Sequence, residues 1–158
     1  MLKRVKTKTL KADGGTFAIV ASKYNARYVD AMLRAAQAEL RRAGARDVQV
    51  VRVPGAFEIP VVAARLAREA SPPLSAIVCL GVILRGATTH AQHIGEAVTQ
   101  ALATLQLHGG VPIIHEVLLL ENEQQAKERC LDRPHNRGAE AAQTALEMAR
   151  VMKSLPGA

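Results

Sequence analysis

Four short apolar segments alternate along the chain with segments of helical periodicity, and this alternation restricts the fold more than any other feature. The expected strands are residues 16–21, 47–53, 76–80 and 112–119. The expected helices lie between residues 25 and 44, where Asn25 or its neighbour can cap the first turn, and over residues 59–66, 89–107, 121–130 and 138–155. Residues 76–80 are all apolar, which is typical of a strand buried on both faces. The alternation predicts an α/β fold: a single-domain, three-layer sandwich with a four-stranded parallel sheet, flanked by helices on both faces as in flavodoxin.

Length and composition favour one compact domain without a membrane segment. The chain has 158 residues and is 49% hydrophobic, which suffices for a single core. It has no apolar run near the roughly 18 residues that span a bilayer. Residues 1–11 are basic but lack the apolar stretch of a secretory signal, so we expect a cytoplasmic location. Cys79 and Cys130 lack metal-ligand spacing, and we expect them to be reduced thiols.

The formal net charge of +7 is concentrated at the N-terminus. Five of the 21 basic residues lie within residues 1–11, which contain no acidic residue. The sequence therefore divides into a flexible basic arm, residues 1–15, and a folded domain, residues 16–158. The chain has only two Phe, two Tyr and no Trp, too few aromatics for a platform that stacks on single-stranded bases. We therefore do not expect a nucleic-acid partner.

Unusual residue types gather directly after three of the expected strands, at residues 22–25, 54–58 and 82–90. In parallel α/β sheets, ligands bind beyond the carboxyl ends of the strands. We therefore expect these three clusters to meet in one ligand site.

The third cluster contains Gly86-Ala87-Thr88-Thr89, a turn of small and hydroxyl residues that enters a helix. Backbone amides and hydroxyls in such a turn can hold a phosphate at the helix N-terminus. The alternative is a plain helix cap, because threonine is a common N-cap residue. His90 follows in the first turn, where the helix dipole disfavours the imidazolium and leaves a neutral base. A lone histidine can equally be structural.

Other candidates also have two interpretations. Phe57 and Glu58 offer an aromatic face beside a carboxylate, or simply begin a helix. Tyr24 could stack on a flat heterocycle or cover the edge of the sheet. Arg129 could form a phosphate fork or belong to a solvated face. His93 is expected at the surface, and no pair of histidines has the ligand spacing of a metal site, so no metal is expected.

Four stretches together resemble the lumazine synthase (6,7-dimethyl-8-ribityllumazine synthase) family. They are residues 53–60 (VPGAFEIP), 85–90 (RGATTH), 123–129 (EQQAKER) and 136–142 (NRGAEAA). The likeness covers about residues 16–153 without large gaps. It implies a transferase of riboflavin biosynthesis that condenses 5-amino-6-(D-ribitylamino)uracil with 3,4-dihydroxy-2-butanone 4-phosphate and needs no cofactor.

The resemblance also implies a role for each site residue. Tyr24 takes the position that stacks on the pyrimidinedione, and His90 takes the proton-transfer position. The other positions of the pyrimidine and ribityl pocket are Ala56, Phe57, Glu58, Val82, Ile83, Leu84 and His115. The positions that hold the phosphate are Ala87, Thr88 and Arg129.

The sequence departs from the family pattern at several of these places. His115 stands where phenylalanine is usual, Glu116 where glycine is usual, and Arg137 where lysine is usual; Leu119-Leu120 replaces a threonine pair. These changes motivate an alternative, a flavin- or lumazine-binding homologue with little or no turnover.

The resemblance further implies an assembly. Members of the family form homopentamers, and many build icosahedral capsids from them; riboflavin synthase is then a candidate partner. The site would lie between neighbours, with Tyr24, Glu58 and His90 from one subunit and His115 and Arg129 from the next.

Overall fold

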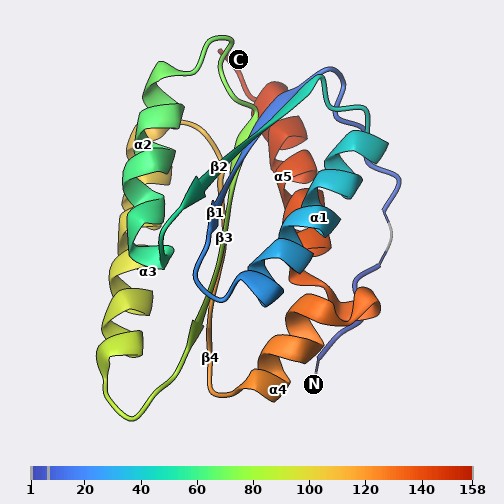
Figure 1. Ribbon diagram of the computed structural model, residues 1–158. Helices are drawn as coiled ribbons and strands as arrows, with labels where there is room; N and C mark the ends of the chain where they lie inside the picture. Colours follow the sequence, from blue (N-terminus) through green and yellow to red (C-terminus); the bar gives the residue numbers. More distant parts are fainter. Residues whose placement is uncertain (1, 7, 158) are drawn as a thin grey trace.

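A computed structural model describes residues 2–6 and 8–157 of the chain. Its four strands form one parallel sheet in the order β2-β1-β3-β4. The strands are β1 (Thr16–Ser22), β2 (Asp47–Val53), β3 (Ala76–Leu84) and β4 (Ile113–Leu120). The main helices are α1 (Ala26–Arg42), α2 (Ile59–Glu69), α3 (His90–Gly109), α4 (Glu123–Ala126) and α5 (Arg137–Ser154). Helices α2 and α3 cover one face of the sheet and α1 and α5 the other (Figure 1), so the predicted three-layer α/β fold is confirmed.

The period-2 alternation of each strand divides its side chains between two cores. Along β1, Phe17 and Ile19 pack toward α1 and α5, whereas Ala18 and Val20 pack toward α2 and α3. All four side chains are fully buried. Burial of one large aliphatic or aromatic side chain contributes about 1.5–3 kcal/mol, so the two cores explain why the sheet is held on both faces.

The buried side chain of Asn136 holds the connection into α5. The Asn136 side chain accepts hydrogen bonds from the backbone of Gly138 and Ala139, at 2.8 and 3.3 Å, and so caps α5. Its Nδ2 donates to the carbonyl of Cys130 at 2.6 Å. This buried side chain therefore satisfies backbone groups on both sides of the α4–α5 connection.

Two details differ from the prediction. Strand β3 continues four residues past Leu80 to Leu84, because residues 81–84 pair with residues 117–120 of β4. Asn25 does not cap α1 with its side chain: it adopts the left-handed conformation, and its Nδ2 donates to the carbonyl of Val82 at 2.7 Å. The long-range bond to β3 has replaced the local one.

The predicted last-but-one helix, residues 121–130, is short and irregular. Only Glu123–Ala126 is α-helical; Lys127–Leu131 continues as a π-helix, and Arg133–His135 forms a 3-10 turn before α5. The Asp132 backbone N–H donates to the Lys127 carbonyl at 3.1 Å, a bond across five residues that is typical of π-helix.

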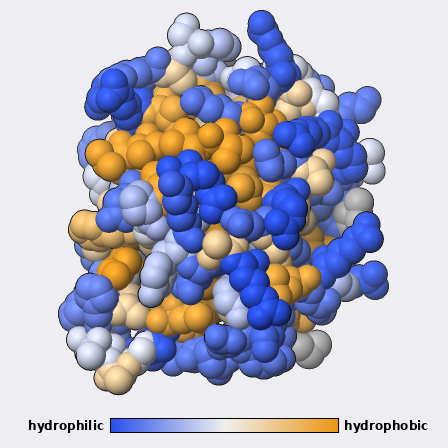
Figure 2. All heavy atoms as spheres, viewed as in Figure 1, coloured by the Kyte–Doolittle hydropathy of each residue, from blue (hydrophilic) through white to orange (hydrophobic). Residues whose placement is uncertain are grey.

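The described part of the N-terminal arm lies against the α1 and α5 side of the molecule. The backbone N–H of Val5 donates to the Pro134 carbonyl at 2.7 Å, and Lys8 pairs with Glu147 at 2.9 Å. Ala12 is buried. Figure 2 shows strongly hydrophilic side chains along this margin of the molecule and apolar ones over the middle of the same face. The flexibility expected for residues 1–15 stays a prediction.

Among the helices of residues 2–6 and 8–157, none combines the length and the apolar content needed to cross a membrane.

Candidate active site

A cavity of about 940 Å³ lies at the carboxyl ends of β1 and β3. Its walls come from the β1–α1 turn, the 3-10 turn Ala56–Glu58, the end of β3 and the first turns of α3. Its lining residues are Tyr24, Asn25, Gly55, Ala56, Phe57, Glu58, Val82, Ile83, Leu84, Gly86, Thr88, His90, Ala91, His93, Ile94 and Ala97. The three strand-end clusters of the sequence thus meet in one space, and its volume lies in the range of small-molecule sites.

Two exposed aromatic rings stand at this cavity. Tyr24 is 74% exposed and Phe57 is 62% exposed, whereas Phe17 and Tyr28 are buried in the core. The Tyr24 backbone N–H donates to the Pro54 carbonyl at 3.0 Å, which joins the two ring-bearing segments. A flat heterocycle bound here would cover apolar ring surface that is otherwise left in water.

The Glu58 carboxylate is held in place beside these rings. Its Oε2 accepts a hydrogen bond from the Gly55 backbone N–H at 2.8 Å. The local interpretation of Glu58 as a residue that begins a helix is therefore correct, and the same bond fixes an acceptor on the cavity wall. Such a fixed carboxylate suits the hydroxyl groups of a ligand.

The turn before α3 leaves the helix N-terminus available. Thr89 occupies the N-cap position without a side-chain bond, and Thr88 Oγ1 accepts only a long one, 3.4 Å, from the His90 backbone N–H. Thr88 and Gly86 line the cavity; Ala87 lies between them without lining it. Among the described residues, no other side chain caps the N-terminus of this 20-residue helix. Its first N–H groups and its dipole can therefore act on an anion in the cavity.

His90 is the first residue of α3 and lines the cavity next to this turn. Its imidazole is exposed, and it is close in sequence and space to the groups that could bind an anion. A base in this position can reach the part of a ligand that lies next to its bound phosphate group. Its role stays a prediction.

His115 lies on β4 and does not line the cavity. Its Nδ1 accepts from the Val117 backbone N–H at 3.1 Å, so the ring proton is on Nε2, which donates to Thr99 Oγ1 at 2.8 Å. Partial burial lowers the pKa of His115, and this hydrogen-bond arrangement also requires the neutral ring. His115 therefore faces α3 at the edge of the sheet.

Arg129 is also apart from the cavity. It lies in the π-helix Lys127–Leu131, with its side chain 27% exposed and its Nη1 donating to the Gln125 carbonyl at 3.4 Å. Its neighbour Cys130 belongs to the core on the α1 and α5 side of the sheet. Within one chain, then, the structure brings together ten of the twelve predicted residues around or beside the cavity and leaves His115 and Arg129 outside it.

Comparison with known proteins identifies the family. The model of the family described as 6,7-dimethyl-8-ribityllumazine synthase matches residues 14–153. The chain belongs to this family. It is 42% identical over 148 residues to the 6,7-dimethyl-8-ribityllumazine synthase of Desulfotalea psychrophila, covering 92% of this chain and 94% of the relative. The Aquifex aeolicus relative is also 42% identical, over 92% of this chain and 95% of its own. The Stenotrophomonas maltophilia relative is 39% identical, over 91% and 93%.

Several residues that line the cavity of this lumazine synthase family member are not among the predicted site residues. His93 was expected at the surface; it is exposed, but it also lines the cavity. Ile94 and Ala97 follow on the same side of α3. Residues three, four and seven positions after His90 share a helix face with it, so helical periodicity could have found them. Asn25 belongs to the expected cluster at residues 22–25, but periodicity could not have predicted its bond to Val82.

No group of three or more His, Cys, Asp or Glu in residues 2–6 and 8–157 is arranged to hold a metal ion. Cys79 and Cys130 are free and buried, and burial raises the pKa of each thiol to about 12. Neither is a thiolate near neutral pH. The expected absence of a metal and of a cofactor stays a prediction.

Glu116, which departs from the family pattern, is half-buried on β4 beneath α5. Burial raises the pKa of its carboxyl to about 7; Arg137 opposes this shift and Glu140 adds to it. Arg137 pairs with Glu140 through Nη1, whereas its buried Nε has no acceptor among the described residues. Glu116 therefore sits beside a guanidinium that is only partly satisfied.

We expect Glu116→Gln to remove a pH dependence of stability. The folded chain holds the Glu116 proton up to about pH 7, whereas the unfolded chain releases it near pH 4.5. The free energy of unfolding of the wild type should therefore fall, relative to the variant, by about 3 kcal/mol as the pH rises through this window.

Urea denaturation of both proteins at several pH values measures this difference. Glu96→Gln, at an exposed position on α3, is the matched control and should show no such trend. Parallel pH profiles for the wild type and Glu116→Gln would contradict the assignment.

Proposed function

We propose that this protein is an active transferase of riboflavin biosynthesis. It condenses 5-amino-6-(D-ribitylamino)uracil with 3,4-dihydroxy-2-butanone 4-phosphate and forms 6,7-dimethyl-8-ribityllumazine, phosphate and water. The proposal is carried by one observation, the arrangement of the cavity at the strand ends. Exposed aromatic rings and a fixed carboxylate lie there together with His90 and the uncapped N-terminus of α3. Membership in the family supports the same activity.

The ring end of the cavity takes the pyrimidine. Tyr24 and Phe57 stack on the heterocycle, while the apolar end of β3, residues 82–84, covers its edge. The ribityl chain lies along Ala56 and Glu58, where the carboxylate accepts from its hydroxyl groups.

The other end takes the phosphorylated ketone. The first N–H groups of α3, the Ala87 amide and the Thr88 hydroxyl bind its phosphate. The amine of the pyrimidine attacks the ketone and loses water to form an imine. Phosphate is then eliminated, and attack of the second amine on the carbonyl so formed closes the ring with loss of a second water. His90 moves protons in these steps, and no cofactor is needed.

The remaining two residues come from a neighbouring subunit. His115 and Arg129 lie outside the cavity of their own chain. Arg129 carries a guanidinium fork, which the lining of the cavity lacks, and His115 would add a further flat ring. A ring of head-to-tail contacts would bring these residues to the next cavity at every interface. We propose a homopentamer, an icosahedral capsid built from it and a cytoplasmic location, with riboflavin synthase as a candidate partner.

Mixed oligomers test the shared site. His90→Ala and Arg129→Ala should each have much lower activity than the wild type when expressed alone, and co-expression should raise the activity above that of either parent. With random mixing, roughly a quarter of the interfaces pair an intact His90 with an intact Arg129 across a head-to-tail contact. Activity is followed by the fluorescence of the lumazine product, and mass spectrometry verifies mixing. Verified mixed oligomers no more active than the parents would place the site within one chain.

The alternative from the sequence, a flavin- or lumazine-binding homologue with little or no turnover, has no support from the family or the named relatives. Incubation of the purified protein with both substrates distinguishes the two functions. Fluorescence of the lumazine product supports the synthase, and an absence of this fluorescence contradicts the synthase.

A further inference from the structure

A second hollow, of about 670 Å³, opens between the N-terminal arm and the connection from α4 to α5. Its lining residues are Arg4, Val5, Lys6, Arg133 and Pro134. Three of these five side chains are cations and none is an acid. The hollow is formed by other elements than the cavity described above and shares no residue with it.

Backbone and side-chain packing hold the two walls together. The Val5 N–H donates to the Pro134 carbonyl at 2.7 Å, so the arm runs directly against the connection. The Val5 side chain also lines a neighbouring hollow over α1, together with Arg34 and Leu131.

The cations of this hollow have no acidic partner within the part of the chain that the structure describes. Arg4, Lys6 and Arg133 are exposed and take part in no ion pair there. The nearby Asp132 carboxylate is bonded to His135 at 2.6 Å. The positive potential at the hollow is therefore uncompensated.

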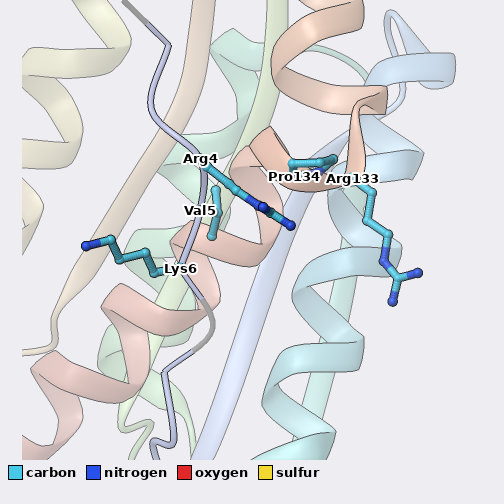
Figure 3. A pocket seen from close by; sticks show the side chains of 5 residues that line it. All are labelled: Arg4, Val5, Lys6, Arg133 and Pro134. Atoms are coloured by element: carbon cyan, nitrogen blue, oxygen red, sulfur yellow. The ribbon is translucent and has the colours of Figure 1, made fainter.

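The orientation of the side chains favours a compact anion. In Figure 3, Arg4 reaches from the arm toward the connection that carries Pro134 and Arg133, Arg133 extends downward beside that end of the hollow, and Lys6 points the other way and adds charge at the rim. Two guanidinium forks can each form paired hydrogen bonds with the oxygens of a phosphate. No aromatic side chain lines the hollow, so it lacks the stacking surface of a site for single-stranded nucleic acid.

We propose that this hollow binds a small phosphate-bearing anion with at least two negative charges, held by Arg4 and Arg133. The site is separate from the phosphate subsite of the proposed reaction and does not depend on that function. Its ligand also ties the N-terminal arm to the α4–α5 connection.

Calorimetric titration of the full-length protein with pyrophosphate tests the proposal, at a fixed ionic strength of about 150 mM so that screening is constant. Arg4→Ala and Arg133→Ala should each weaken binding by about 10-fold or more through loss of a charge-assisted fork. Arg133→Lys, which keeps the charge without the fork, should fall between Arg133→Ala and the wild type. Arg150→Ala removes one exposed charge from α5 away from the hollow and should leave the affinity within about 2-fold.

Several results would overturn the proposal. One is that the wild type does not bind pyrophosphate, or that Arg150→Ala weakens this binding as much as Arg4→Ala and Arg133→Ala do. A second is loss of binding in Arg129→Ala alone, which would assign the anion to the reaction site. A third is Arg133-dependent binding of a single-stranded RNA oligonucleotide without binding of pyrophosphate. Circular dichroism shows that each variant is folded; Arg4 and Arg133 are exposed and unpaired in the described chain, so their removal should not disturb the core.

Discussion

Gly138→Ala should destabilise the fold by about 3 kcal/mol or more, because there is no space for a methyl group at this position. A Cβ at Gly138 would lie 2.0 Å from the Met32 carbonyl oxygen and 2.5 Å from its carbonyl carbon. Both are backbone atoms of α1, so no rotation of a side chain can relieve the overlap. Helix α5 would have to move away from α1, and its buried residues Ala142 and Ala145 would lose their packing.

Chemical denaturation followed by far-UV circular dichroism measures the effect. Gly95→Ala is the matched control: this glycine is also helical, but its Cβ would meet only the Leu119 side chain, at 3.4 Å. The gain in helix propensity there should keep the change within about 1 kcal/mol. If Gly138→Ala proved as stable as Gly95→Ala, the close approach of the two helices would be refuted.

His90→Ala should lower kcat by roughly 10- to 1000-fold with little change in KM, given the usual contribution of a general acid–base group. The reason is the position of His90 at the first turn of α3, beside the anion-binding groups of the cavity. The effect is expected in kcat because proton transfer acts in the transition state rather than in binding. Steady-state kinetics with both substrates, followed by product fluorescence, measures the two constants separately.

His108→Ala is the control for this substitution. His108 lies at the opposite end of α3, where its Nδ1 is 3.0 Å from the Thr104 carbonyl, and it does not line the cavity. The kcat of His108→Ala should equal that of the wild type. An unchanged kcat in His90→Ala would exclude His90 from the mechanism, and a rise in KM alone would assign it to binding.

The positions of the strands and most helices could be predicted because their signals are local. The apolar run at 76–80 and the helical periodicity up to Gly44 each depend on residues close together in the chain. Asn25 and the segment 121–130 could not be predicted in this way. Asn25 bonds to Val82, 57 residues away, and the π-helix at 127–131 packs Cys130 into the core between α1 and α5.

The sequence alone determined which residues follow the carboxyl ends of the strands. Because the carboxyl ends of parallel strands lie at one edge of the sheet, the topology then brought Tyr24, Glu58 and His90 to one cavity. The resemblance already assigned His115 and Arg129 to a neighbouring subunit, and the tertiary structure puts both outside the cavity of their own chain. Only the tertiary structure decided that Arg4 of the basic arm meets Arg133. These outcomes depend on how helices pack and where loops dock, and such long-range contacts leave no periodic pattern in the chain.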